Sequence, residues 1–364
     1  MNDRTRILAA VGATVLLFLG VQLGALALVD PFSESGRQAV ENPEDPTNSI
    51  LYVGVMLVAT GLMLAAFKYD LDWLIRLLLI GVSVMISWYV FAELVPSIVG
   101  PFVSNGVASG LAIVASLAVG GALLWYPEWY VIDSAGVIMG GGAAALFGIS
   151  FGLLPALLLL SVLAIYDAIS VYGTEHMLDL AEGVMDLKIP VVLVIPMTLS
   201  YSYLAAGSTD DVLEDGGTET ETEAETNGDI PSDTPGNDTT DETTGGAAQT
   251  DDTATAENDG QTEEGALDRD ALFIGLGDAV IPTVLVASAA AFLDVGTLAV
   301  PVITLNLPAL GAALGTIAGL LALMYMVLEG RAHAGLPLLN GGAIGGYLLG
   351  ALASGLSLAA AIGL

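Results

Sequence analysis

Two aspartates, Asp167 and Asp278, stand inside long apolar stretches of the sequence. Asp278 closes the motif Gly275-Leu276-Gly277-Asp278, a short way inside an apolar run from Ala271 to Phe292. Asp167 follows Tyr166 in an earlier apolar run. A carboxylate at hydrocarbon depth is costly and usually functional, although it can also be a polar group that faces a helix bundle or the headgroups. Two of them on separate helices suggest a dyad.

Such a pair could hydrolyse a peptide bond. Two close carboxylates do not both ionise easily, so they share one proton. The ionised partner takes a proton from water as the water attacks the peptide carbonyl, and the protonated partner hydrogen-bonds the carbonyl oxygen and then helps to protonate the leaving nitrogen. Gly275 and Gly277 weaken the start of their helix by about 1 kcal/mol each relative to alanine. They therefore allow local unwinding and the close approach of a substrate backbone.

The composition is that of a membrane protein. Of 364 residues, 54% are hydrophobic and 13% charged, and the mean hydropathy is +0.75. The chain has no cysteine, and His176 and His333 are its only histidines, so we expect no cofactor and no metal site. The net charge of −32, from 40 acidic and 8 basic residues, argues against nucleic-acid binding. This acidic, lysine-poor composition is typical of a salt-loving archaeon.

Hydropathy predicts an all-α membrane protein with nine transmembrane helices. The first uncharged run is too long for a cleaved signal peptide, so we interpret it as a retained span. The predicted spans are Ile7–Val29, Ile50–Phe67, Trp73–Val95, Phe102–Leu124, Val131–Phe147, Leu153–Tyr172, Ala271–Phe292, Leu298–Leu328 and Ala334 to the C-terminus.

The long connection between spans six and seven has three parts. Residues 174–188 have the spacing of an amphipathic helix. The β-branched run between Pro190 and Pro196 favours a short strand or re-entrant segment over a further span that would continue to Ala206. The acidic, low-complexity stretch after it cannot bury enough apolar surface to fold and is predicted to be disordered. The chain thus divides into a six-helix part (1–206), a linker (207–266) and a three-helix part (267–364).

The basic residues predict the topology. Nine spans place seven of the eight on one side and Arg37 alone on the other, so the N-terminus should be cytoplasmic and the C-terminus outside. Spans six and seven are then antiparallel. Asp167 lies about five residues before the cytoplasmic end of span six, and Asp278 about seven residues inside span seven. At about 1.5 Å per residue, both lie about 10 Å below that surface.

These motifs resemble those of the presenilin and signal peptide peptidase family of intramembrane aspartyl proteases, in its archaeal branch. That family carries Tyr-Asp in its sixth span, Gly-x-Gly-Asp in its seventh and Pro-Ala-Leu at the start of its ninth. Tyr166-Asp167 and Gly275 to Asp278 match the first two. Pro308-Ala309-Leu310 spells the third but follows Asp278 too soon, inside span eight. Ala334-Gly335-Leu336-Pro337 has the right position and departs from the family's Pro-Ala-Leu-Pro at its first two residues.

The resemblance implies an intramembrane aspartic endopeptidase that acts on transmembrane proteins or signal peptides within the lipid bilayer. By the same resemblance Asp167 and Asp278 are catalytic. The residues that would shape the site or bind substrate are Tyr166, Gly275, Leu276, Gly277, Ala334, Gly335, Leu336 and Pro337. The predicted orientation is that of presenilin, which favours substrates whose N-terminus is outside. An extended substrate could add a strand beside Val191 to Ile195 or beside the segment before Gly275.

A rival from another class is an ion- or proton-coupled membrane transporter that uses the same intramembrane carboxylates. Such a protein should show inverted repeats, and the two halves show no convincing one. Peptide cleavage would distinguish a protease from a transporter. The remaining polar residues of the spans are interpreted as interfacial or bundle-facing groups: Glu93, Asp133, Asp294, Asn306 and Asn340.

Overall fold

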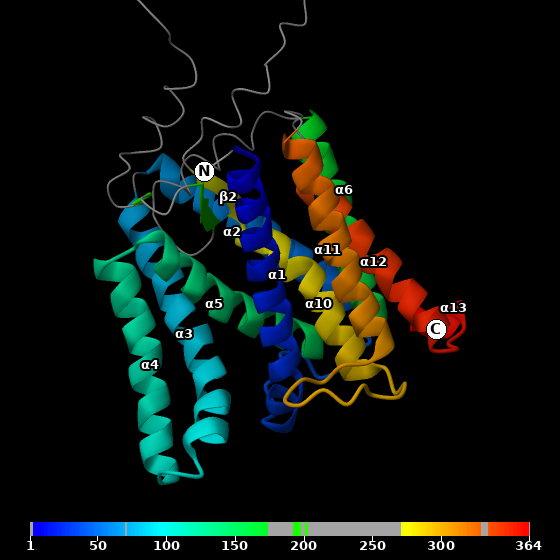
Figure 1. Ribbon diagram of the computed structural model, residues 1–364, viewed down its shortest axis with the longest axis horizontal. Helices are drawn as coiled ribbons and strands as arrows, with labels where there is room; N and C mark the ends of the chain where they lie inside the picture. Colours follow the sequence, from blue (N-terminus) through cyan, green and yellow to red (C-terminus); the bar gives the residue numbers. More distant parts are fainter. Residues whose placement is uncertain are drawn as a thin grey trace, which may run out of the picture.

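The computed structural model describes residues 3–69, 71–173, 192–197, 201–202, 271–328 and 334–363, which form a helical bundle with one small sheet (Figure 1). The expectations for residues 174–188 and 207–266 lie outside these ranges. The helices are α1 (Asp3–Glu34), α2 (Thr47–Lys68), α3 (Asp72–Val99), α4 (Asn105–Trp125), α5 (Trp129–Ser150), α6 (Leu153–Gly173), α10 (Leu276–Phe292), α11 (Leu307–Leu328), α12 (Gly335–Ala353) and α13 (Leu358–Ala361). The strands are β1 (Val192–Pro196) and β2 (Ala271–Gly275).

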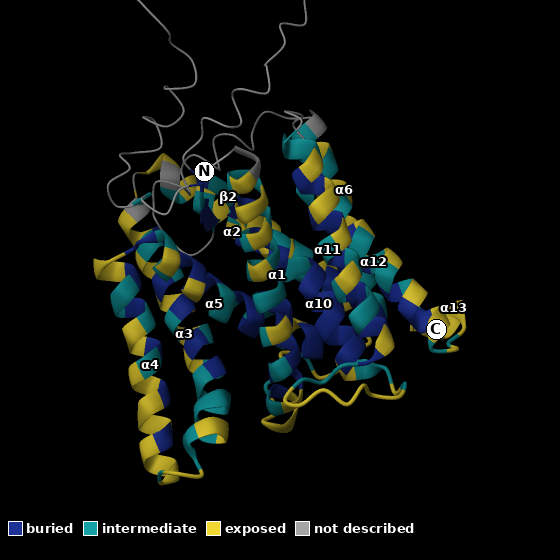
Figure 2. Cartoon of the chain, viewed as in Figure 1, coloured by how far each residue is buried: buried dark blue, intermediate teal, exposed yellow. Residues whose placement is uncertain are grey.

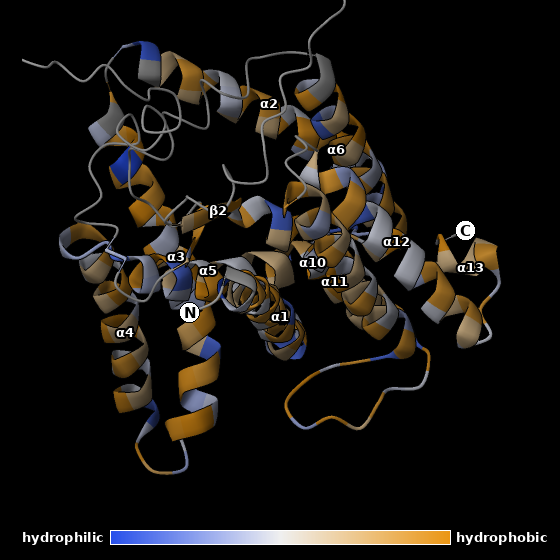
Figure 3. Ribbon diagram, turned by 45° about the horizontal axis from the view of Figure 1, so that its top comes forward, coloured by the Kyte–Doolittle hydropathy of each residue, from blue (hydrophilic) through white to orange (hydrophobic). Residues whose placement is uncertain are grey.

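Eight of these helices are long and apolar enough to cross a membrane: α1 to α6, α11 and α12. Their surfaces are largely hydrophobic in Figure 3, as lipid-facing helices must be. The helix α10 is equally apolar but has 17 residues. The protein is therefore a mostly helical, multi-pass membrane protein, and the expectation of an all-α chain needs one correction, the β1–β2 sheet.

The helix α10 lies at the centre of the bundle. It contacts α1, α5, α6, α11 and α12, and every residue from Pro282 to Ala290 is buried. Figure 2 shows this core as the dark segments of α10 and the neighbouring part of α5. Small residues permit the close packing, because a side chain at Gly148 of α5 would overlap Ala287 of α10. A helix buried all round is apolar all round, which matches its sequence.

The two strands form an antiparallel sheet in which Val194 lies opposite Phe273 and Val192 opposite Gly275. The expectation of a strand at this place is confirmed. Successive side chains of a strand point to opposite faces, and here both faces are buried. Leu193 belongs to a buried cluster that includes residues of α1 and α11, and Val194 belongs to another that includes residues of α3 and α5. The sheet is thus enclosed between two groups of helices.

Three predicted span boundaries were wrong. Span eight begins at Leu307 rather than Leu298, because Asn306 caps it: its Oδ1 accepts the N–H of Ala309 at 2.9 Å. The last span ends at Ala353, where the chain turns at Gly355, whose φ is +84°. The run from Ala271 begins as a strand, so the seventh helix starts later than hydropathy suggested.

Candidate active site

Asp278 lies in the first turn of α10, directly after the sheet. β2 ends at Gly275, which is also the residue before the helix. The expectation that Asp278 lies about seven residues inside its helix was therefore wrong, because the first part of the run pairs with β1. The N–H groups of a first helical turn lack partners within the helix, and the helix dipole favours negative charge there. The strand-to-helix junction thus supplies a suitable place for a carboxylate.

Asp167 reaches the start of α12 from α6. Its side chain is buried, and its Oδ2 accepts the N–H of Leu336 at 3.0 Å. Leu336 belongs to the first turn of α12, so this bond satisfies one of the unpaired helix donors. A second bond joins the same helices, because Asn340 Nδ2 donates to the carbonyl oxygen of Leu160 at 2.9 Å. The position of Asp167 therefore depends on α12 as well as α6.

One short segment, at the start of α12, lies beside both carboxyl groups. Leu336 donates to Asp167, and its neighbour Gly335 lies so close to Asp278 that a Cβ built there would be 3.6 Å from Oδ2. A Cβ built at Gly275 would lie at the same distance from that oxygen. The structure thus brings together residues from all three sequence motifs.

The other predicted site residues lie farther from this contact. Tyr166 is half exposed on the outside of α6. Gly277 is exposed, and the nearest atom to a Cβ built there would be Ile281 Cδ1 at 3.9 Å. Ala334 is buried at the start of α12. Ala334 has an extended backbone, but Pro337 lies within the first turn of α12. The expected irregular backbone is therefore absent from residues 335–337, because proline is tolerated at a helix start.

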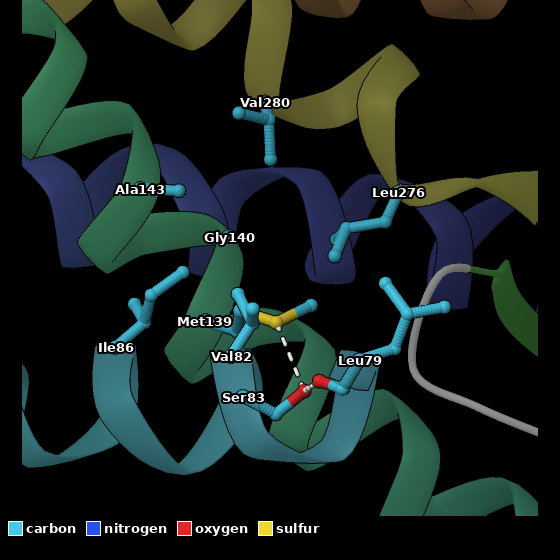
Figure 4. A pocket seen from close by; sticks show the side chains of 9 residues that line it. All are labelled: Leu79, Val82, Ser83, Ile86, Met139, Gly140, Ala143, Leu276 and Val280. Atoms are coloured by element: carbon cyan, nitrogen blue, oxygen red, sulfur yellow. Dashed lines mark hydrogen bonds between the residues drawn. The ribbon is translucent and has the colours of Figure 1, made fainter. Parts of the chain in front are cut away.

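Leu276 extends from α10 towards α3 and α5. A Cβ built at Gly140 would be 3.1 Å from Leu276 Cδ1. Leu276 also lines an apolar pocket of about 210 Å³ between α3, α5 and α10. Figure 4 shows the side chains of this pocket and the hydrogen bond from Ser83 Oγ to Met139 Sδ. Neither aspartate lines the pocket, so Leu276 links the Gly275–Asp278 motif to α5.

Sequence reasoning missed a buried carboxylate beside the sheet. Asp133 of α5 is 6% exposed, and its Oδ1 accepts the N–H of Val194 at 2.8 Å. The interpretation of Asp133 as a bundle-facing polar group did not assign it this partner. A usable signal was the spacing of Asp133, Gly136 and Gly140, which puts all three on one face of a helix.

Known proteins match the chain over most of its length. Residues 15–356 match the family described as "Signal-peptide peptidase, presenilin aspartyl protease". Two crystal structures of a presenilin family intramembrane aspartate protease are similar to the chain at 29% identity. The alignment with the first structure, in space group C222, covers 94% of this chain and 99% of the chain in that structure, with a TM-score of 0.57. The alignment with the second structure, in space group P2, covers 94% of this chain and 97% of the chain in that structure, with a TM-score of 0.56. No curated protein matches the chain.

Proposed function

Because this chain belongs to the family of signal-peptide peptidases and presenilins and is an intramembrane aspartyl protease, we propose that Asp167 and Asp278 are its catalytic pair. The observation that carries the proposal is the place of Gly335 and Leu336 beside the two carboxyl groups: Leu336 donates to Asp167, and a Cβ built at Gly335 would be 3.6 Å from Asp278 Oδ2. An aspartic protease needs two carboxylates near enough to share one proton. Helix α12 keeps the two aspartates beside the same backbone segment.

The pair acts on water and the scissile carbonyl. One carboxylate takes a proton from water while the water oxygen bonds to the carbonyl carbon, and the other donates a hydrogen bond to the carbonyl oxygen. The C–N bond then breaks as the leaving nitrogen receives a proton from the pair. We propose that Gly275 and Gly335 leave the space beside Asp278 open for the water and the substrate backbone, because a side chain at either position would fill it.

Six further residues complete the proposed site. Leu276 anchors the motif against α5, and Gly277 leaves the surface of the first turn of α10 unobstructed. Ala334, Leu336 and Pro337 set the start of α12 beside the pair. Tyr166 offers its exposed ring to the substrate next to Asp167.

Cleavage of a transmembrane peptide by the detergent-purified chain tests the pair. We expect Asp167→Ala and Asp278→Ala each to abolish cleavage, with products of the wild type mapped by mass. Asp294→Ala, in the exposed loop after α10, is the matched control and should cleave normally. Retained cleavage in either active-site variant would contradict the proposal. Ion flux without cleavage in the wild type would instead indicate the transporter.

An intramembrane protease acts on transmembrane substrates, and we propose that the substrate adds to the sheet as an extended strand. At the β1 edge that faces away from β2, the N–H of Val194 is taken by Asp133. Val192, two residues earlier and with the same orientation, is therefore the donor that we assign to the substrate strand. Val192→Pro should therefore lower cleavage and preserve the fold, whereas Val192→Ala, which keeps the N–H, should not. Equal cleavage by both variants and the wild type would rule out strand addition at β1.

We propose nine spans, with α10 as the short seventh, a cytoplasmic N-terminus and an outside C-terminus in an archaeal plasma membrane. The distribution of basic residues supports this orientation, and the acidic composition supports a salt-rich habitat. The chain has no cysteine, so a single cysteine at Glu41, in the loop after α1, reports its own side. A membrane-impermeant maleimide should label Glu41→Cys in intact cells; labelling that requires lysis would reverse the orientation.

A further inference from the structure

The first turns of α5 are bonded to the edge of β1 that is not paired with β2. In an antiparallel pair the N–H and C=O of one residue point to the same side. The N–H of Val194 goes to Asp133 Oδ1 at 2.8 Å, so this residue faces away from β2 and towards α5. Both side chains are buried, with exposed fractions of 1% for Val194 and 6% for Asp133. A buried N–H that loses its acceptor carries a full desolvation penalty, so this bond constrains the strand.

The same face of α5 contacts the beginning of α10. Gly136 and Gly140 follow Asp133 at spacings of three and seven residues, which places the three on one side of the helix. A Cβ built at Gly136 would be 3.0 Å from Leu193 of β1, and one at Gly140 would be 3.1 Å from Leu276. One helix face therefore fixes both β1 and the residue that lies two positions before Asp278.

Two other side chains hold the chain just after β1. Ser202 Oγ donates to Glu128 Oε1 at 2.6 Å, at the N-terminal end of α5. Arg6 Nε of α1 donates to the carbonyl oxygen of Met197 at 3.4 Å. With Asp133, these contacts hold the chain at Val194, Met197 and Ser202. None of the three anchoring residues belongs to a motif that the resemblance identifies.

We propose that Asp133 is a positioning residue for catalysis: by accepting the N–H of Val194 it fixes β1, and through the pairing of β1 with β2 it fixes the place of Asp278. Val194 lies opposite Phe273, five residues before Asp278. A displacement of β1 therefore moves the junction from which the reactive carboxylate projects. The inference rests on the proposed role of Asp278.

The test is the cleavage of a transmembrane peptide by the full chain in detergent, with kcat and KM measured separately. Asp133→Asn keeps an oxygen acceptor of the same geometry, whereas Asp133→Leu keeps the approximate size and removes the acceptor. We expect Asp133→Asn to stay near the wild-type kcat. Asp133→Leu should lower kcat on the order of 10- to 100-fold with little change in KM, because small misplacements of a reacting group have effects of this size.

Val194→Pro removes the same hydrogen bond from the donor side. If the bond is the reason for the effect, adding Asp133→Leu to Val194→Pro should lower kcat no further. If Asp133→Leu does not yield folded protein, Val194→Pro tests the proposal by itself: it should lower kcat with little change in KM. A second mutation that multiplies the loss would overturn the proposal.

Two other results would also overturn it. Equal loss of kcat in Asp133→Asn and Asp133→Leu would mean that the charge matters rather than the bond to Val194. A raised KM with an unchanged kcat would make Asp133 a substrate contact. Asp278→Ala, assayed in parallel, separates the two proposals, because cleavage in that variant contradicts the catalytic pair whatever Asp133 does.

Asp45 provides a matched control outside the site. Its Oδ1 accepts the N–H of Thr47 at 2.9 Å in the loop before α2, so it makes the same kind of bond as Asp133. Asp45→Leu should leave kcat and KM unchanged. A loss of kcat there equal to that of Asp133→Leu would show that any lost carboxylate bond slows the enzyme, which would overturn a specific role for Asp133.

Discussion

The helix pair α11–α12 and the helix α2 use glycine in opposite ways. In α11, Gly311, Gly315 and Gly319 lie against the backbone of α12, and a side chain at Gly315 would overlap the carbonyl oxygen of Gly342. In α2, no described atom lies within 4 Å of a Cβ built at Gly61, and 6% of the most apolar window of this helix is buried. One helix is packed backbone to backbone, and the other faces the surroundings along most of its length.

The difference follows from what drives packing in a membrane. Lipid tails are as apolar as leucine, so close van der Waals contact between helices stabilises a bundle more than burial does. The seam formed by the glycines of α11 and α12 fixes the helix that starts beside both aspartates. By contrast, α2 contacts the bundle near its N-terminal end, where Ser49 and Tyr52 meet α5, α6 and Phe151. The seam therefore helps to fix the start of α12 beside the two aspartates, whereas α2 has no such role.

The largest expected effect comes from filling the seam. Gly315→Leu places a side chain where the carbonyl oxygen of Gly342 lies, so α11 and α12 must separate. We expect a loss of more than about 3 kcal/mol of stability, at the upper end for overpacking, and a loss of cleavage. Gly61→Leu, the control in α2, should change stability by less than about 1 kcal/mol. Denaturant midpoints in detergent measure both, and equal losses would abolish the distinction between the two helices.

A smaller effect is expected from the cap of α11. Asn306 accepts from the N–H of Ala309 at 2.9 Å and donates to the carbonyl oxygen of Ala289 at 2.7 Å, so it joins α10 to the seam. Asn306→Ala should lower stability by about 1–3 kcal/mol. Asn48 of α2 is only partly buried, and its Nδ2 donates to the carbonyl oxygen of Asn42 at 2.8 Å in an exposed hydrogen bond. Asn48→Ala should cost less than about 0.5 kcal/mol, as the same denaturant measurement would show; the reverse order would contradict the assignment.

Hydropathy predicted the long helices because twenty apolar residues suit a membrane and little else. Hydropathy failed where a strand is as apolar as a transmembrane helix. Ala271 to Gly275 is as hydrophobic as the helix after it, and the pairing with β1 that makes it a strand depends on residues far away in the chain. The start of α11 was misplaced for a related reason, since the cap at Asn306 outweighs the apolar residues before it.

The site was predictable as far as its motifs. Asp167 and Asp278 lie beside one segment of α12, which carries the third motif. The bond of Asp133 could not be foreseen, because its acceptor role depends on which edge of β1 faces α5. A lone aspartate near a helix end has many possible partners. Sequence spacing assigns such a residue to one face of its helix, but the tertiary structure determines which residues that face contacts.

The smallest expected effect tests how α2 is attached. Ser49 is 4% exposed, and its Oγ donates to the carbonyl oxygen of Pro155 at 2.7 Å, which joins the first turn of α2 to α6. Ser49→Ala should cost about 0.5–1.5 kcal/mol and speed amide hydrogen exchange in the first turns of α2. Thr60→Ala is the control, because Thr60 Oγ1 donates within its own helix, to the carbonyl oxygen of Met56 at 2.9 Å. If exchange in α2 stays unchanged in Ser49→Ala, the other contacts of α2, among them the ring of Tyr52 at 4.8 Å from that of Phe151, hold the helix without this hydrogen bond.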